Sequence, residues 1–344
     1  MKITTSFIFL FVLFFSFTSQ QAFALTLRLD TGRVIYFEYQ KSREPGAPTF
    51  LLLPGVNRAL LLQESGARAL LAKGYGVASM NFSVQPFSVD VLGKDETPFF
   101  MNHSPSLQEL AGEVNELAKS LQTDLQSGPV IPVSLSYSGA VSFYLEDFPV
   151  IIETVPLTSA AAQNPQLEAY RNSLKLGEFW NPIFGPAITR SLLDQAYRKK
   201  WGDQVDAISK QFDFSPDRRD QMIEGYTTLS RATEGFAWDL SQLPRTPRRV
   251  FLFAENESKS LLQHQIQIFE NLYDENPQTL LFVIKNSGHV VPSEQPTAYA
   301  EALDLVAQGN TKNFAGVVEV NGTLRNAKHF EGAEAHKYLE SLIQ

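Results

Sequence analysis

The chain has 344 residues, of which 44% are hydrophobic and 19% charged, with 20 Gly and 19 Pro. This globular balance excludes a mainly disordered, collagen-like or coiled-coil architecture. The formal net charge is -8, which disfavours binding of nucleic acid or an anionic membrane surface through a basic face. The sequence has no cysteine, which excludes disulfides, thiolate nucleophiles and Cys-ligated metals.

The first 24 residues are expected to be a secretory signal peptide. Lys2 precedes an apolar run of 11 residues, Phe7–Phe17, and Ala22-Phe23-Ala24 is a small-x-small cleavage pattern. We therefore expect cleavage after Ala24 and export, to the periplasm or outside the cell. The alternative is a membrane anchor, but this run is shorter than the roughly 20 apolar residues that a span needs. No later segment approaches that length, so no membrane span is expected after cleavage.

Strands and helices are expected to alternate through most of the remaining chain. The expected strands are Leu25–Leu29, Arg33–Tyr39, Thr49–Leu53, Gly76–Phe82, Val130–Leu135, Ile151–Leu157, Arg249–Ala254 and Leu280–Ile284. The expected helices are Leu60–Ala72, Leu107–Leu125, Leu261–Leu272, and two that begin near Ala140 and Thr297. The first two strands form a hairpin, and the others predict an α/β fold with a doubly wound, mostly parallel sheet.

Residues 159–243 interrupt this alternation. They contain no convincing strand and are rich in helix formers and aromatic residues. We expect a helical cap insertion, because compact domains rarely separate successive strands by so much chain. The alternative is that these residues are extra helices of the core. The core would comprise residues 25–158 and 244–308, followed by a tail at 309–344 with a hairpin around Asn321-Gly322 and a last helix.

The junction between the strand at residues 130–135 and the following helix is a candidate nucleophile site. A nucleophilic Ser136 would have small residues, Ser134 and Ser138, two positions before and after it, as a sharp strand-to-helix turn requires. The helix N-terminus would direct free backbone N–H groups towards an oxyanion formed there. A second register would make Ser138 the nucleophile.

The sequence Ser-Leu-Ser-Tyr-Ser-Gly at residues 134–139 resembles the nucleophile elbow of the α/β-hydrolase superfamily, usually Gly-x-Ser-x-Gly followed by Gly. Both flanking glycines are serine here, which keeps the small size but not the free access of glycine to positive φ. The resemblance covers about residues 25–158 and 244–308. It implies a sheet of the α/β-hydrolase type, with an antiparallel N-terminal edge and a helical cap.

His289 follows the strand Leu280–Ile284 in a Gly-His-x-x-Pro pattern with Glu-Gln-Pro downstream. At this place an imidazole can be presented at the same sheet edge as Ser136. There it could take the hydroxyl proton and return it to the leaving group. The pattern is similar to the catalytic-histidine loop of the superfamily.

Glu257 follows the strand Arg249–Ala254 and is the candidate acid that orients the imidazole. It matches the place where the superfamily commonly has an Asp, three residues after a small residue at the end of the strand. Glu255 is the alternative acid, and either carboxylate could instead be a solvated loop charge.

Two backbone N–H groups are expected to bind the oxyanion. The first belongs to Tyr137, the residue after the nucleophile, and the second to Val56, in the loop after the strand Thr49–Leu53. The superfamily usually has His-Gly-x in this loop, where the present chain has Pro54-Gly55-Val56.

The order Ser136, Glu257, His289 reproduces the Ser…acid…His order of α/β-hydrolases. It predicts a serine hydrolase, carboxylesterase- or lipase-like, that acts on a small-molecule ester or acyl substrate through an acyl-enzyme on Ser136. An amide or peptide hydrolase is a second interpretation, and a catalytically inert binding or scaffold protein of this fold is a third. No cofactor or metal is expected, and no Gly-x-Gly-x-x-Gly follows the first strand, which argues against dinucleotide binding.

Overall fold

The computed structural model describes residues 23–56, 62–85, 88, 104–159, 225, 228–245, 247–309, 314 and 316–344. The strands are β1 (Phe23–Arg28), β2 (Val34–Gln40), β3 (Thr49–Leu52), β4 (Gly76–Asn81), β5 (Val130–Leu135), β6 (Val150–Thr154), β7 (Arg248–Ala254), β8 (Leu280–Ile284), β9 (Gly316–Asn321) and β10 (Thr323–Phe330). The helices are α1 (Ser65–Ala72), α3 (Leu107–Thr123), α4 (Ser138–Ser142), α8 (Lys259–Glu275), α9 (Val291–Glu294), α10 (Pro296–Ala307) and α11 (Gly332–Ile343).

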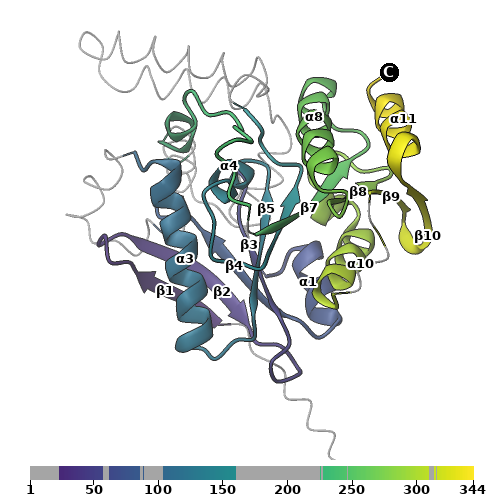
Figure 1. The fold of residues 1–344 in the computed structure, drawn as a ribbon. Coiled ribbons are helices and arrows are strands. Elements are labelled where there is room, and N and C mark those ends of the chain that lie inside the picture. Colours follow the sequence, from purple (N-terminus) through teal and green to yellow (C-terminus); the bar gives the residue numbers. More distant parts are fainter. Residues whose placement is uncertain are drawn as a thin grey trace, which may run out of the picture.

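All ten strands form one sheet in the order β1-β2-β4-β3-β5-β6-β7-β8-β9-β10 (Figure 1). From β4 to β9 in this order, neighbouring strands run parallel. β1 and β2 at one edge and β10 at the other are antiparallel. The expected α/β fold with a mostly parallel sheet and an antiparallel N-terminal edge is thus confirmed.

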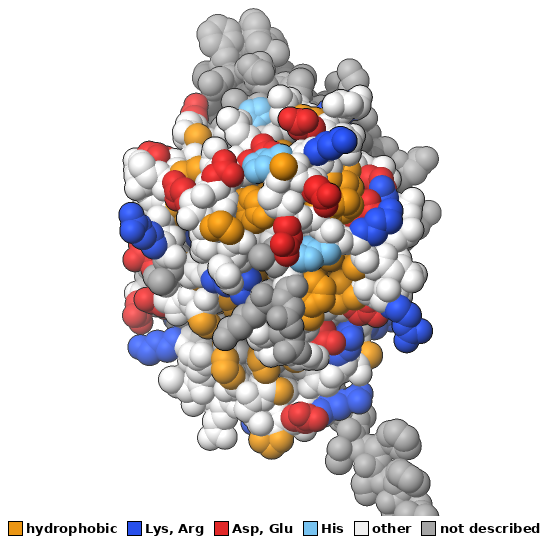
Figure 2. Space-filling model, turned by 45° about the vertical axis from the view of Figure 1, so that its right-hand side comes forward, with side chains coloured by type: hydrophobic (Ala, Val, Ile, Leu, Met, Phe, Trp, Pro, Cys, Tyr) orange, Lys and Arg blue, Asp and Glu red, His pale blue; other side chains and the backbone are white. Residues whose placement is uncertain are grey.

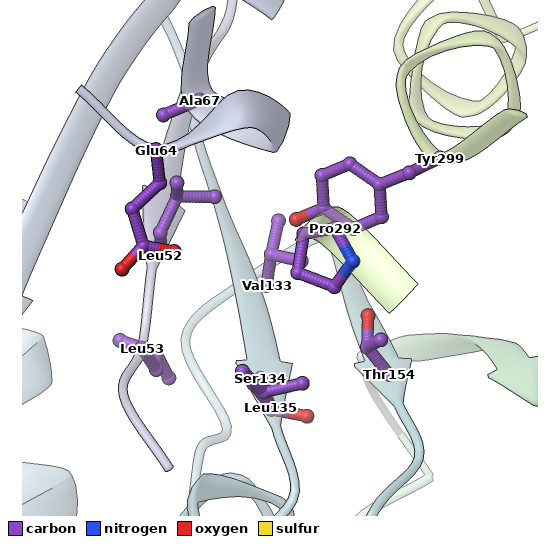
Figure 3. A pocket seen from close by; sticks show the side chains of 10 residues that line it. All are labelled: Leu52, Leu53, Glu64, Ala67, Val133, Ser134, Leu135, Thr154, Pro292 and Tyr299. Carbon is purple, nitrogen blue, oxygen red and sulfur yellow. The ribbon is translucent and has the colours of Figure 1, made fainter. Parts of the chain in front are cut away.

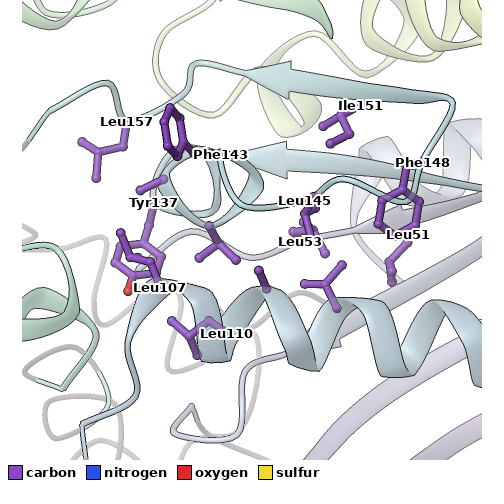
Figure 4. Close-up of a cluster of buried hydrophobic side chains, with 14 of the residues drawn as sticks. Leu51, Leu53, Leu107, Leu110, Tyr137, Phe143, Leu145, Phe148, Ile151 and Leu157 are labelled. Carbon is purple, nitrogen blue, oxygen red and sulfur yellow. The ribbon is translucent and has the colours of Figure 1, made fainter. Parts of the chain in front are cut away.

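Helices cover both faces of the sheet. Side chains of α1 and α10 share one buried cluster with one face of the sheet, and those of α3, α4, α8 and α11 share another cluster with the opposite face. In Figure 4, Leu107 of α3 lies beside Tyr137 of the turn after β5, and both belong to the second of these clusters. Every residue of β3, β5 and β8 is buried, which explains why these strands are continuous apolar runs in the sequence.

The C-terminal residues, expected as a hairpin and a helix, extend this sheet. β9 pairs in parallel with β8, β10 pairs antiparallel with β9, and α11 packs on the same face as α8. Five of the six residues of β9 are buried, so the strand belongs to the core. The hairpin was visible in the sequence, but its docking beside β8 was not.

Two expected segments fall mainly outside the described residues. These are the signal peptide, of which residues 1–22 are not described, and the cap, of which residues 160–224 and 226–227 are not described. β1 begins at Phe23, so its first two residues, Phe23 and Ala24, fall within the expected signal peptide. Within the described ranges no helix is long and apolar enough to cross a bilayer.

Charges of both signs are dispersed over the face that carries α8, α10 and α11. Figure 2 shows acidic, basic and small apolar areas interspersed on this face, without one continuous field of either sign among the side chains that are described.

A buried ion pair joins β6 to β7 beneath the turn that follows β5. Glu153 is fully buried and pairs with Arg249, whose guanidinium also donates to Ser142 O at 2.9 Å and stacks 5.2 Å from the ring centre of Trp238. The other Glu153 oxygen accepts from Ser134 Oγ at 2.5 Å. The pair therefore links the sheet to the segments on both sides of Ser136.

Replacing Arg249→Met should leave the Glu153 carboxylate buried without a charged partner. We expect the free energy of unfolding in urea to fall by about 3–5 kcal/mol. The double variant E153Q/R249M should lose clearly less, because a neutral amide costs less to bury than an unpaired carboxylate. Equal losses in the single and double variants would contradict this account.

Candidate active site

The parallel strands bring four predicted site residues to one edge of the sheet. Ser136 follows β5, Glu257 follows β7, His289 follows β8 and Val56 follows β3. Since the carboxyl ends of parallel strands meet at the same edge, these residues share the region where α/β sheets bind their ligands.

Ser136 has a φ of 56°, a left-handed conformation that is uncommon outside glycine. Its N–H donates to Thr154 O at 3.0 Å, and its carbonyl accepts from Gly139 at 2.9 Å and Leu157 at 2.8 Å. A Cβ atom at Gly139 would lie only 2.5 Å from Pro156 Cβ, so glycine is required there. The turn is therefore held in a strained backbone conformation by its neighbours, as at a nucleophile elbow.

The two flanking serines are buried, whereas Ser136 is half-buried. Ser138 Oγ accepts from Leu135 N–H at 2.7 Å and lies 3.2 Å from Leu53 O. The Ser134 hydroxyl donates to Glu153. Both flanking hydroxyls thus brace the turn, and Ser136 is the serine of this segment that is open to solvent.

Glu257 and His289 are joined by a hydrogen bond of 2.5 Å between Oε2 and Nδ1. This bond engages one imidazole nitrogen and leaves Nε2 for another partner. Burial of Glu257 opposes its negative charge, but the hydrogen bond and charge of His289, together with hydrogen bonds from Ser258, outweigh burial and hold the pKa of Glu257 below its ordinary value. The carboxylate is therefore ionised at neutral pH and can stabilise a protonated imidazole.

The loop around His289 is held by Glu294, a residue to which the sequence analysis gave no role. The Glu294 carboxylate accepts from the N–H groups of Gly288 at 2.7 Å and Val290 at 3.1 Å, the two neighbours of His289. The only sequence signal was its place in the Glu-Gln-Pro segment after the histidine. Glu294 thus fixes the backbone that carries the imidazole.

The alternative acid, Glu255, has different partners. It forms an ion pair with Lys285 and accepts from Asn286 N–H at 2.9 Å. The structure therefore brings Glu257 to His289 and ties Glu255 to the start of the same loop. Among the described residues, no group of three or more His, Cys, Asp or Glu side chains could hold a metal ion.

The loop after β3 approaches Ser136 closely. A Cβ atom at Gly55 would lie 3.9 Å from Ser136 Cβ and 3.7 Å from Leu135 O. The backbone hydrogen bonds among the described residues assign no acceptor to the N–H of Val56 or of Tyr137. Both groups are thus free to donate to an oxygen atom bound beside Ser136.

The histidine loop also returns to β5. Figure 3 shows Pro292, three residues after His289, beside Val133 and near Leu135. Pro292 lines the same small pocket as Ser134 and Leu135 at the end of β5. The segment after His289 therefore lies beside the end of β5, although β6 and β7 separate β5 from β8 in the sheet.

A buried carboxyl group lies under the turn after β4. Glu113 of α3 accepts from Ser83 Oγ at 2.5 Å and from Ser83 N–H at 3.0 Å, with Arg33 at 3.5 Å. Burial raises the pKa of Glu113 from 4.5 to about 7, despite the opposing hydrogen bonds of Ser83 and the charge of Arg33.

The raised pKa of Glu113 makes stability depend on pH. Because the folded state holds this proton up to about pH 7 and the unfolded state releases it near 4.5, the stabilisation is complete below pH 4.5 and is lost as pH rises through about 7. Relative to Glu113→Gln, the wild type should lose up to about 3 kcal/mol of unfolding free energy between pH 5 and pH 8. Urea unfolding of both proteins from pH 5 to pH 8 measures this loss. A difference in unfolding free energy between the two proteins that does not change with pH would contradict the prediction.

Comparison with known proteins identifies the family. Residues 50–302 match the family model described as "Alpha/beta hydrolase family". The chain belongs to the α/β-hydrolase family. A search of curated proteins gives no significant match.

Solved α/β-hydrolase structures share this fold at low sequence identity. MGS-M2, an α/β-hydrolase enzyme from a Medee basin deep-sea metagenome library, is 16% identical with a TM-score of 0.55, covering 83% of this chain and 97% of its own. Bromoperoxidase from Bacillus anthracis is 15% identical with a TM-score of 0.54, covering 83% and 99%. A thermophilic esterase from Thermogutta terrifontis is 18% identical with a TM-score of 0.51, covering 84% and 98%. At these identities the likeness concerns the fold alone.

Proposed function

We propose that this α/β-hydrolase is an exported serine hydrolase that cleaves carboxylic esters through an acyl-enzyme on Ser136. The observation that carries the proposal is the hydrogen bond of 2.5 Å between His289 Nδ1 and Glu257 Oε2. It supplies an oriented imidazole at the sheet edge where Ser136 has its strained backbone. Family membership supports the same chemistry.

In the proposed reaction, Ser136 Oγ attacks the ester carbonyl carbon while His289 Nε2 takes the hydroxyl proton. The N–H groups of Val56 and Tyr137 stabilise the resulting oxyanion. The intermediate collapses to acyl-Ser136 as the imidazolium gives its proton to the leaving alcohol. Water, deprotonated by His289, then releases the carboxylic acid and restores Ser136. Ionised Glu257 fixes the imidazole and stabilises its protonated form throughout.

Esters are proposed rather than amides because an alcohol is the easier leaving group, and the same machinery would serve both. One solved structure with this fold is described as a thermophilic esterase from Thermogutta terrifontis. Another belongs to a description of carboxylesterases of the thaumarchaeon Nitrososphaera gargenis. The proposal of export depends on the apolar run and small-x-small pattern within residues 1–24.

A fluorophosphonate probe, which phosphonylates activated serines, tests the nucleophile. We expect labelling of the wild type at Ser136, located by peptide mass spectrometry, together with hydrolysis of short p-nitrophenyl esters. Ser136→Ala should abolish both, whereas Ser138→Ala should keep labelling at residue 136 in whatever fraction folds. Labelling at Ser138 would support the other register, and a folded wild type that neither labels nor hydrolyses esters would support a binding or scaffold protein.

Glu257→Gln should lower kcat for the ester about 10²- to 10⁴-fold, because a neutral amide cannot stabilise the imidazolium and can favour the wrong tautomer. KM should change little, since Glu257 is not expected to touch the substrate. Glu255→Gln is the matched control, because this carboxylate is bound to Lys285 rather than His289, and its kcat should stay within about threefold of the wild type. A larger loss in E255Q than in E257Q would contradict the assignment.

A further inference from the structure

The peptide unit between Gly55 and Val56 is anchored by a side chain from the turn that follows β4. Gln85, which follows β4, donates from Nε2 to Gly55 O at 3.0 Å, and its Oε1 accepts from Phe82 N–H at 2.9 Å. The side chain is buried, with 1% of the residue exposed. Because both ends of the amide have a backbone partner, the orientation of the Gln85 side chain is fixed.

This anchor also fixes the direction of the Val56 N–H. In a trans peptide the C=O and N–H bonds point to opposite sides, so holding Gly55 O on the Gln85 side directs the Val56 N–H away from Gln85. The same peptide lies beside the candidate nucleophile, since a Cβ atom at Gly55 would be 3.9 Å from Ser136 Cβ.

The turn that contains Gln85 is itself held by hydrogen bonds. Gln85 N–H donates to Phe82 O at 2.8 Å, which closes the turn, and Ser83 between them is held by Glu113 through two hydrogen bonds of 2.5 and 3.0 Å. A Cβ atom at Gly225 would lie 2.5 Å from Val84 O, so the turn is also packed from outside. These contacts restrict movement of the turn and so keep the Gln85 amide within hydrogen-bond distance of Gly55 O.

We propose that Gln85 is a positioning residue for catalysis: it holds the Gly55–Val56 peptide so that the Val56 N–H points at the developing oxyanion. The inference depends on the proposed hydrolase function. Pro54 has no polar side-chain atom to hold this loop, and Gln85 supplies a hydrogen bond from the turn after β4 instead. The effect should fall on kcat rather than on substrate binding, because the negative charge on the carbonyl oxygen develops only after the substrate has bound, as the transition state is reached.

Gln85→Met removes, at similar volume, both the hydrogen bond to Gly55 O and the one from Phe82 N–H, whereas Gln85→Glu replaces only the donor by a carboxylate oxygen. Loss of an oxyanion donor costs about 10²–10³ in kcat, and misdirecting one should cost less. We therefore expect kcat for a p-nitrophenyl ester to fall about 10- to 100-fold in Q85M and at least as far in Q85E, with KM within about twofold of the wild type. The rate of fluorophosphonate labelling at Ser136 should fall in parallel.

Tyr273→Phe is the matched control. The Tyr273 hydroxyl accepts from Gly332 N–H at 3.0 Å near the far edge of the sheet, so its loss removes a hydrogen bond of the same kind, between a side chain and the backbone, far from Gly55. Y273F should lower the thermal midpoint but leave kcat and labelling rate unchanged. Values of kcat are expressed per labelled active site and are measured below the thermal unfolding midpoint of every variant. A partly unfolded variant is therefore not mistaken for one with a lower kcat.

The outcomes separate this inference from the proposed function. A wild type that neither labels at Ser136 nor hydrolyses esters would overturn the proposed function, and the role of Gln85 with it. An active wild type with Q85M within about twofold of its kcat would overturn the role of Gln85 alone. If Q85M does not fold, Gln85→Asn decides in the same way, because it keeps a neutral amide and shortens the side chain by one methylene group.

Discussion

The left-handed backbone of Ser136 is the constraint on which the site depends. A serine at φ 56° is held there by three backbone hydrogen bonds: one joins it to Gly139 in the same turn, and two join it to Thr154 and Leu157, in the segment at and after the end of β6 that the sheet places beside the turn. Such strain persists only where the surroundings determine it. Its consequence is that the chain leaves β5 and enters α4 with one half-buried hydroxyl at the carboxyl edge of the sheet.

Serine in place of the two flanking glycines does not open this turn. Ser138 Oγ occupies the space below the elbow and bonds to the backbone at Leu135, while Ser134 joins the buried Glu153–Arg249 pair. The hydroxyl groups therefore add bonds where glycine would leave none. The two serines that depart from the common family pattern are thus matched by local hydrogen bonds. The histidine loop is held in a similar way, because Glu294 binds the backbone on both sides of the imidazole.

The sequence predicted those features that are local to one strand end. Ser136, Glu257 and His289 each follow an apolar run, and parallel strands place such positions at one edge. Gln85 and Glu294 escaped prediction because their roles depend on which backbone atoms fold back against them, and Gly55 is 30 residues away from Gln85. The pairing of β9 with β8 was missed for the same reason, since the sequence pattern of a hairpin does not show which other strand the hairpin pairs with. Most of the expected cap lies outside the described residues.

The most direct test of the account is a crystal structure of the wild-type protein after reaction with a fluorophosphonate. We predict a phosphonyl group on Ser136 Oγ, with one phosphonyl oxygen within hydrogen-bond distance of both the Val56 and Tyr137 N–H groups and His289 Nε2 directed at the adduct. A phosphonyl group on another residue, or a phosphonyl oxygen turned away from both N–H groups, would contradict the account.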